Sequence, residues 1–511
     1  MGCGQRFTRA DLVFANGGEA ETLDPALMTA QLDMRLAYAL FEGLTTFDAN
    51  GEPRPGVAER WEISPDGTVY TFHLRADALW TNGEPVTAGD FVASWQRALI
   101  PETASRNSYQ LYYLKNGQKF NDPAAGLTDF AQVGVHALDD RTLRVELEHP
   151  TPFFLDLCCT SVFLPVHLRT VQHWGDGWTK PEHIVGNGPF TMAEWRLNDR
   201  LRLRKNPRYW DRAHVRLDTV DALPISQANV ALNFFSNGEC DLLMDKGLVP
   251  VMLIADLRRK PYFHSAPFLG NFFIRFNCTR PPFNDPRVRQ AFSLVVDKRL
   301  LVEKITKAGE TPADYFVPPG TGGYQSPKAG LGRDPERARR LLAEAGFPGG
   351  RGFPSFSFLY NNGEQNQYIG VELKSMFERE LGVSMGLRPQ ENKVYQNTMS
   401  NVDYDLARSS WVGDYNDPNT FLDMWVAGSG NNRTGWSDGR YDTLIAEAGR
   451  EFDPQKRFDI FRRAEEMLIS EGTPICPLYY YVGIQLYDGN RLGGVQGNVL
   501  DEHPIREMYR K

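Results

Sequence analysis

The sequence predicts an α/β protein built from more than one lobe, and three observations lead to that prediction. The chain has 511 residues, more than one ordinary hydrophobic core accommodates, so two or three lobes are expected. An apolar strand at 354–362, a helix at 369–381 and a strand at 403–411 follow one another, which is typical of α/β folds. The composition, 41% apolar and 23% charged, is ordinary for a globular protein.

Charge, hydropathy and cysteine spacing exclude several classes of function. The net charge of −8 argues against nucleic acid as the main partner. No stretch approaches 18 uninterrupted apolar residues, so no transmembrane helix is expected. The cysteines and histidines show no metal-ligand spacing, so neither a metal nor a cofactor is expected. Adjacent Cys158 and Cys159 are expected to be buried thiols, and a bridge between Cys278 and Cys476 is left open.

Local signals place the first elements of the chain. Residues 12–14 are apolar and predict a short strand, which Asn16-Gly17-Gly18 ends. Asp24-Pro25 predicts the start of a helix that runs to Leu40. Asp66-Gly67 is a turn signal, and it precedes a strand whose apolar residues alternate over 70–74.

Later elements follow from the same kinds of signal. Thr87 is predicted to cap a helix with apolar residues at 91, 92 and 95. The strand at 200–204 alternates leucine with arginine, and its arginine face is expected to be solvated. Asp-Pro pairs at 285–286 and 334–335 predict two further helix starts, and the aromatic-rich run 474–487 predicts another strand.

Residues 403–421 hold the chemistry that points to a ligand. The apolar run from Tyr404 to Trp411 predicts a buried strand, and Asp417-Pro418 predicts the start of a helix. Asp414 lies between them, has no capping role and is followed by Tyr415. A carboxylate beside aromatic groups suits a ligand's ammonium group. A solvated turn aspartate is the alternative.

Several stretches of the sequence resemble one known family. WVGDYNDP, which follows an Ala-Arg pair, is similar to the ligand-binding strand of the oligopeptide-binding proteins, the extracytoplasmic receptors of peptide ABC importers within solute-binding protein family 5. GEPRPGVAERWEISPDGTVYTFHLRADALW, from residue 51, and IVGNGPFTMAEWRLNDRLRLRKNPRYWD, at 184–211, resemble two further family signatures. The resemblance covers about residues 11 to 505.

The resemblance implies a periplasmic-binding-protein-like fold with two main lobes, an inserted third lobe and a ligand cleft between hinged lobes. The expected lobe I combines 1–31, 155–265 and 483–511. The expected lobe II, the inserted domain, is 32–154, and lobe III is 266–482. Chain crossings near 265 and 483 would form the hinge.

The resemblance also implies how a ligand binds. An extended peptide would pair its backbone with Gly18 to Glu21 and with Ser410 to Val412. Asp414 would receive the peptide α-ammonium group. Arg408 would receive a carboxylate, or would instead form a buried ion pair. The predicted ligand contacts are Gly18, Glu19, Ala20, Glu21, Tyr109, Arg408, Ser410, Trp411, Val412, Gly413, Asp414, Tyr415 and Tyr481.

The chain departs from the family pattern at the carboxylate end and at the side-chain pockets. Two cysteines that form a disulfide in enterobacterial members align with Gly270 and Val412, so that bridge is expected to be absent. A pocket tryptophan aligns with Asn392, a histidine with Asn366, and a lysine falls near Thr306. Peptide length and sequence preference therefore do not follow from the resemblance.

The implied role is capture of short peptides outside the cytoplasm and their delivery to a permease with its ATPases, by a monomer. Met1-Gly2-Cys3 resembles the end of a lipobox, so Cys3 is expected to be a lipid site, the only link to a membrane, in a periplasmic or lipid-anchored protein whose sequence here has no signal peptide. The alternatives are a dipeptide or other specialised small-molecule receptor of this fold, and a peptide sensor without transport. No HExxH, GxSxG or phosphate loop is present, so no enzyme is expected.

Overall fold

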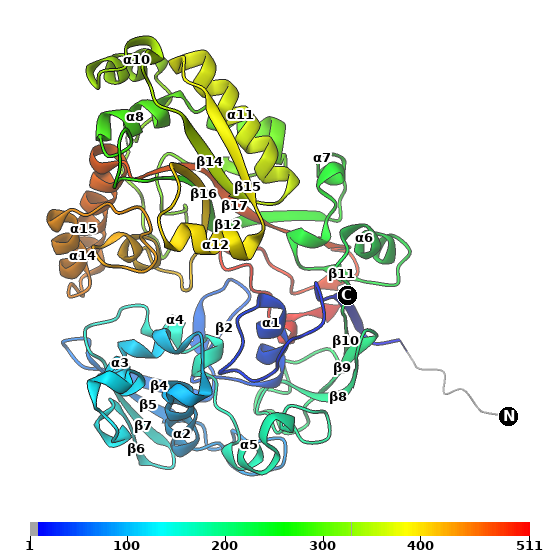
Figure 1. Cartoon of the computed structure of the whole chain (residues 1–511). Coiled ribbons are helices and arrows are strands. Elements are labelled where there is room, and N and C mark those ends of the chain that lie inside the picture. Colours follow the sequence, from blue (N-terminus) through cyan, green and yellow to red (C-terminus); the bar gives the residue numbers. More distant parts are fainter. Residues whose placement is uncertain (1–8, 329) are drawn as a thin grey trace. The chain divides into compact units, whose positions relative to one another are not determined.

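The computed structural model describes residues 9–328 and 330–511. Cys3, the expected lipid site, lies outside the described residues. The chain divides into two compact units, Met1–Ala266 with Gly483–Lys511, and Pro267–Val482. The chain passes between them within two long strands, β12 (Phe263–Phe276) and β17 (Ile475–Tyr487) (Figure 1). In the described residues, no helix combines the length and apolar character that crossing a membrane requires.

The main sheet of the first unit is built around β1 (Leu12–Ala15), which confirms the predicted first strand. β1 is parallel to a strand on each side, β10 (Thr219–Leu223) and β11 (Leu242–Leu243), and all four of its residues are buried. Apolar residues on both faces are expected of a strand inside a covered sheet. The sheet continues antiparallel through β9 (Arg200–Lys205) to β8 (Phe190–Arg196), and β11 pairs with the end of β17.

A second, antiparallel sheet of the first unit has the strand order β4 (Ala58–Ile63), β5 (Val69–Leu74), β7 (Thr142–Glu146), β6 (Val135–Asp139). The predicted alternation is confirmed on β5, where every second side chain is buried. α2 (Ala88–Leu99) begins at the predicted cap: the Asp90 amide donates to Thr87 Oγ1 (3.3 Å), and the Thr87 amide donates to Asp90 Oδ2 (2.8 Å). This reciprocal pair is a capping box.

The first unit contains further short elements. They are β2 (Thr45–Phe47), β3 (Pro53–Pro55), β18 (Leu492–Gly493), β19 (Tyr509–Arg510), α1 (Gln31–Leu40), α3 (Gly117–Asn121), α4 (Phe154–Leu157), α5 (Leu168–Trp174), α6 (Ala228–Ser236) and α7 (Ile254–Leu257).

Ion pairs overturn two local predictions in the first unit. α1 begins at Gln31 and not at Asp24, because the Asp24 carboxylate binds Arg97 (2.9 and 2.5 Å) and accepts from the Ala26 amide, which forms a turn. The arginine face of β9 is not simply solvated. Arg202 forms a bidentate pair with Asp221 at 2.6 Å, and its side chain is 11% exposed.

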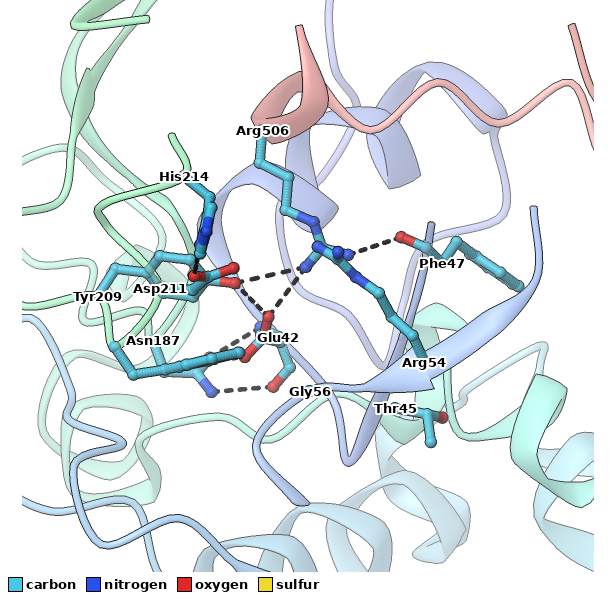
Figure 2. A network of polar contacts seen from close by, with 12 residues as sticks. Glu42, Thr45, Phe47, Arg54, Gly56, Asn187, Tyr209, Asp211, His214 and Arg506 are labelled. Carbon is cyan, nitrogen blue, oxygen red and sulfur yellow. Dashed lines mark hydrogen bonds and ion pairs between the residues drawn. The ribbon is translucent and has the colours of Figure 1, made fainter. Parts of the chain in front are cut away.

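A buried polar network joins the C-terminal segment to the first unit's core (Figure 2). Glu42 Oε1 accepts from Arg506 Nη1 (3.0 Å) and from the Tyr209 hydroxyl, and Glu42 Oε2 accepts from Trp210 Nε1 (2.6 Å). Arg506 Nη2 also donates to the Phe47 carbonyl (2.6 Å). Both charges are compensated by hydrogen bonds, which a buried ion pair requires. Residues near the C-terminus are therefore part of the unit's interior.

The second unit confirms the predicted strand–helix–strand alternation. β14 (Phe356–Asn361) is parallel to β15 (Met385–Gln390) and to β16 (Leu406–Val412), and β16 is antiparallel to β12. β17 follows β12 in the strand order, and β13 (Thr311–Pro312) pairs with β17. The other elements are α8 (Pro286–Val295), α9 (Lys298–Leu300), α10 (Pro335–Glu344), α11 (Glu364–Leu381), α12 (Asn392–Ser400), α13 (Asn419–Leu422), α14 (Gly439–Ala448) and α15 (Pro454–Glu466).

Helices α8, α10 and α11 pack together in the second unit (Figure 1) and supply one apolar cluster with β12 and β14. Both predicted Asp-Pro caps are confirmed. Asp285 accepts from the Arg287 amide (2.8 Å), and Asp334 accepts from the Arg337 amide (2.9 Å). Phe292 of α8 contacts Phe377 of α11 with ring centroids 4.7 Å apart. The cluster gives β14 and β16 a rigid support.

The described cysteines are all free: Cys158, Cys159, Cys240, Cys278 and Cys476. The expectation of buried thiols at Cys158 and Cys159 is confirmed, and burial raises the pKa of both well above the ordinary thiol value. The bridge between Cys278 and Cys476 that the sequence left open is not formed. Within residues 9–328 and 330–511, no group of three or more His, Cys, Asp or Glu side chains is arranged to hold a metal ion.

Glu465 is a fully buried carboxyl on α15 that makes the second unit's stability depend on pH. It accepts from the amides of Phe316 (2.9 Å) and Val317 (2.7 Å) and from the Tyr324 hydroxyl (2.8 Å). Burial outweighs these bonds and raises the pKa of Glu465 to about 7 from its ordinary 4.5. The folded state therefore holds this proton more tightly than the unfolded state, and its stabilising effect is lost as the pH rises from 4.5 through 7.

Glu465→Gln should remove this dependence. Relative to the wild type, the variant should gain up to about 3 kcal/mol of stability between pH 5 and pH 8, measured by urea unfolding at both pH values. Glu466→Gln, at the adjacent residue whose carboxylate accepts from the Tyr315 hydroxyl, is the matched control and should show no such gain. A constant difference between Glu465→Gln and wild type at both pH values would refute the assignment.

Candidate ligand-binding site

The loop after β16 places Asp414 directly beyond the end of a strand. The Gly413 amide donates to the Leu269 carbonyl of β12 (2.8 Å), and the Asp414 amide donates to Thr420 Oγ1 (3.1 Å). A Cβ at Gly413 would lie 2.7 Å from Leu269 Cδ2 and 3.0 Å from Thr420 Cγ2, so a larger residue does not fit. The loop is therefore held tightly at its base, and the half-buried Asp414 is positioned by it.

Asp417 has a structural role, as the sequence predicted, although the helix begins one residue later than expected. α13 starts at Asn419, and Asp417 Oδ1 accepts from the Asn419 amide (2.8 Å). Both Asp417 oxygens also accept from Arg457 of α15, at 2.6 and 2.8 Å, and both side chains are buried. This buried pair fixes the loop that carries Asp414.

β16 has an edge that its neighbours use only in part. On one side it pairs with β12 along its whole length, from Gly270↔Val412 to Phe276↔Leu406. On the other side, within the described residues, β14 pairs with it only at Phe358↔Leu406 and Leu359↔Ala407. The Arg408 carbonyl on that side accepts from the Tyr395 hydroxyl. Alternate residues point to the same edge, so the backbone of Ser410 and Val412 faces the side that β14 leaves uncovered.

Arg408, in the middle of β16, retains hydrogen-bonding capacity. Its guanidinium carbon lies 4.8 Å from the Phe272 ring centroid. Its Nε is buried and, among the described residues, has no hydrogen-bond partner. Arginine presents a planar set of donors that matches a carboxylate. Arg408 can therefore receive an anionic ligand group, which favours the carboxylate hypothesis over a buried ion pair.

Aromatic side chains surround this strand. Tyr481 of β17 stacks on Phe268, with ring centroids 6.4 Å apart, and burial raises the pKa of Tyr481. Tyr415 is 5% exposed, and its hydroxyl accepts from Asn419 Nδ2 (3.0 Å). The Trp411 indole nitrogen is buried without a partner among the described residues. Val412, by contrast, is 44% exposed at the end of the strand.

The predicted contacts of the first unit lie after β1. Gly17, with φ +92°, turns the chain into residues 18–21. The Glu19 carboxylate accepts from Trp195 Nε1 (2.6 Å) and from the Asn198 amide (2.8 Å), so this side chain is occupied within its own unit. The Glu21 amide donates to Asp33 Oδ1 (3.0 Å). Gly18, Glu19 and Ala20 are half-buried and Glu21 is exposed.

Tyr109 is separate in sequence from the other predicted contacts and lies in a single-turn segment, Ser108–Tyr113. Its side chain is 43% exposed, and its hydroxyl accepts a long hydrogen bond from Gln110 Nε2 (3.5 Å). Gly18 to Glu21 and Tyr109 belong to the first unit, and the other predicted contacts, Arg408 to Tyr415 and Tyr481, belong to the second.

The positions that depart from the family pattern have local roles. Gly270 and Val412 are register partners on β12 and β16, and a Cβ at Gly270 would lie 3.3 Å from Val412 Cγ2. Asn392 is exposed at the start of α12. Asn366 donates to the Asn361 carbonyl (3.0 Å), and Thr306 is buried against Glu310 (2.7 Å).

The sequence did not indicate Asp423. This residue follows the short helix α13, and its Oδ2 accepts from Asn419 Nδ2 (2.9 Å). Burial raises the pKa of Asp423 to about 7, and repulsion from Asp414 and then Asp417 adds to the shift. Its place in the apolar run FLDMW, nine residues after Asp414, is the signal that could have revealed it.

Comparison with known proteins identifies first the class and then the family. The fold is that of a binding protein: an unliganded open form of MppA, a periplasmic murein tripeptide binding protein, superposes with a TM-score of 0.85 at 34% identity, over 98% of both chains. Residues 52–433 match the family described as bacterial extracellular solute-binding proteins, family 5 Middle, and the chain belongs to this family.

Two further relatives agree. The periplasmic oligopeptide-binding protein OppA of Salmonella typhimurium is 36% identical over 506 residues, which cover 98% of this chain and 92% of the relative. OppA of Haemophilus influenzae, solved in complex with the peptide RPPGFSPFR, has a TM-score of 0.78 at 31% identity over 98% of both chains.

Proposed function

We propose that this protein captures short peptides in extended form and delivers them to an ABC importer. The observation that carries the proposal is the partly uncovered edge of β16, which ends directly at Asp414. An extended peptide can add to such an edge through its own backbone. Family membership and the peptide bound by the Haemophilus relative support the same conclusion.

The proposal gives each group a role. The backbone of Ser410 and Val412 pairs with the peptide backbone, and Gly18 to Glu21 do so from the first unit. Asp414 receives the α-ammonium group. Backbone pairing does not depend on side chains, so peptides of mixed sequence should bind. The remaining predicted contacts, Tyr109, Trp411, Gly413, Tyr415 and Tyr481, would shape the surroundings of the ligand.

The test is native mass spectrometry of the purified protein, followed by release and sequencing of any bound material. We expect peptides of mixed sequence and narrow length. Protein stripped by unfolding and refolding should then bind added trialanine. A single non-peptide mass, together with no trialanine binding, would refute the proposal and favour a specialised small-molecule receptor of the same fold.

Arg408→Gln tests the carboxylate end. Loss of one charge-assisted contact should weaken trialanine binding by about tenfold, by isothermal titration calorimetry. Trialanine amide, which lacks the carboxylate, should bind wild type and Arg408→Gln with equal affinity. An equal loss for both ligands would mean that Arg408 supports the strand and does not contact the carboxylate.

The lobe boundaries, 1–31 with 155–265 and 483–511, 32–154, and 266–482, are part of this proposal. The separate antiparallel sheet of β4, β5, β7 and β6, all within 32–154, supports an inserted lobe. A lipid anchor at Cys3, a monomeric state, a periplasmic or membrane-anchored location and the absence of catalysis are proposed with it. A peptide sensor without transport remains the alternative role; uptake of labelled peptide by cells that express the permease distinguishes the two.

A further inference from the structure

Three carboxylates lie close together in the segment 414–423 of the second unit, and they are compensated unequally. Asp417 is neutralised by both terminal nitrogens of Arg457. Asp423 has only a neutral partner, Asn419 Nδ2, and within the described residues it forms no ion pair. The sequence, the family resemblance and the proposed function assign no role to Asp423.

The groups that face Asp423 do not supply a compensating cation. Its own segment contributes Asp414 and Asp417. α14 contributes Tyr441, whose hydroxyl donates to the Leu422 carbonyl (2.6 Å), and Asp442, which accepts from the Ala427 amide (3.0 Å). α15 contributes Arg457, which is bound to Asp417.

Without a compensating cation, the ionised form of Asp423 is disfavoured. Burial raises the pKa of Asp423 to about 7, and the charge of Asp414 contributes to the shift before that of Asp417. The protonation of Asp423 is therefore sensitive to whatever neutralises Asp414.

We propose that Asp423 carries a proton in the free protein and releases it to solvent when a ligand's ammonium group binds beside Asp414. The proposal rests on the peptide-binding function given above and adds a linked proton to it. The O–H bond of the Asp423 carboxyl breaks, the proton passes to the buffer, and the bond's electron pair stays on the carboxylate. One positive charge enters and one leaves, so the net charge of the segment is unchanged.

The direction of the coupling follows from electrostatics. A ligand cation at Asp414 offsets the repulsion that Asp414 exerts on Asp423, which favours the ionised form of Asp423. By linkage, deprotonation of Asp423 must favour the cation to the same extent. Affinity for ligands with a free amino group should therefore rise from acid pH up to about pH 7 and then level off. Ligands without an ammonium group should not show this rise.

The experiment is calorimetric titration of trialanine into the full-length protein at pH 6.5, in phosphate and in imidazole buffer, whose ionisation heats differ. The slope of the observed heat against buffer ionisation heat gives the number of protons exchanged. We expect release of about 0.7 proton per peptide, because a group with a pKa of about 7 is mostly protonated at this pH. The peptide's own amino group is almost fully protonated at pH 6.5 and contributes little.

Asp423→Asn should bind trialanine with the same heat in both buffers, since the amide keeps the contact with Asn419 and carries no titrating proton. Asp459→Asn, an exposed carboxylate on α15, is the matched control and should release protons as the wild type does. Buffer-independent heats in the wild type would overturn the coupling, and so would unchanged release in Asp423→Asn. Complete absence of trialanine binding to stripped wild type would instead contradict the proposed function itself.

Discussion

Replacing Asp414 with alanine should weaken the binding of trialanine by about 100-fold. A hydrogen-bonded contact between charged groups contributes about 1.5–3 kcal/mol, and a half-buried carboxylate held at the base of a rigid loop should reach the upper part of that range. Calorimetric titration of stripped wild-type and variant protein at pH 7 measures the effect directly.

Asp459→Ala is the matched control for this prediction. It removes one carboxylate from an exposed position of α15 in the same unit, so it changes net charge equally without touching the loop. We expect its affinity to stay within about twofold of wild type, since exposed charges are screened by salt. Equal affinities for Asp414→Ala and Asp459→Ala would remove Asp414 from the site.

Arg457→Leu should destabilise the second unit by about 3–5 kcal/mol, because it leaves the Asp417 carboxylate buried without its cation. The Arg457 side chain is 3% exposed, and its guanidinium carbon also lies 4.6 Å from the Phe461 ring centroid. The loop that carries Asp414 depends on this pair, so binding of trialanine should weaken as well. Urea unfolding followed by circular dichroism gives the loss of stability.

Arg462→Leu serves as the control for Arg457→Leu. Arg462 lies on the same helix and pairs with Asp459, which is exposed. Exposed pairs contribute about 0–1 kcal/mol, so this variant should unfold close to wild type. Similar losses in the two arginine variants would mean that helix propensity or packing, and not the buried charge pair, determines the stability of this region.

Much of the secondary structure could be predicted because the signals were local. Thr87, Asp285 and Asp334 cap the helices they were expected to cap, since each side-chain oxygen accepts from an amide two or three residues later. The alternation on β5 predicted its buried face because side chains of a strand alternate between its two faces.

The misplaced helix start and the arginine face of β9 have one cause. Asp24 binds Arg97, 73 residues away, and Arg202 binds Asp221 on the neighbouring strand. Such partners are brought together only by the tertiary fold, and no local pattern in the sequence identifies them. The same holds for Asp417, whose cap role was visible while its pairing with Arg457, 40 residues later, was not.

The candidate site shows the same division. Asp414 could be singled out because it follows an apolar strand and has no capping role. The uncovered edge of β16 could not, because it depends on where β14 stops pairing. Asp423 was missed because its protonation depends on burial and on two neighbouring carboxylates, which a linear pattern does not reveal.

The central claim is that the protein recognises a peptide by its backbone and its free amino end. Calorimetric comparison of trialanine with N-acetyl-trialanine on stripped wild-type protein tests it most directly, because acetylation removes the ammonium charge and keeps the peptide backbone. The account predicts that acetylation weakens binding by about 100-fold, as the loss of one charge-assisted contact implies. Equal affinity for the two peptides would contradict it.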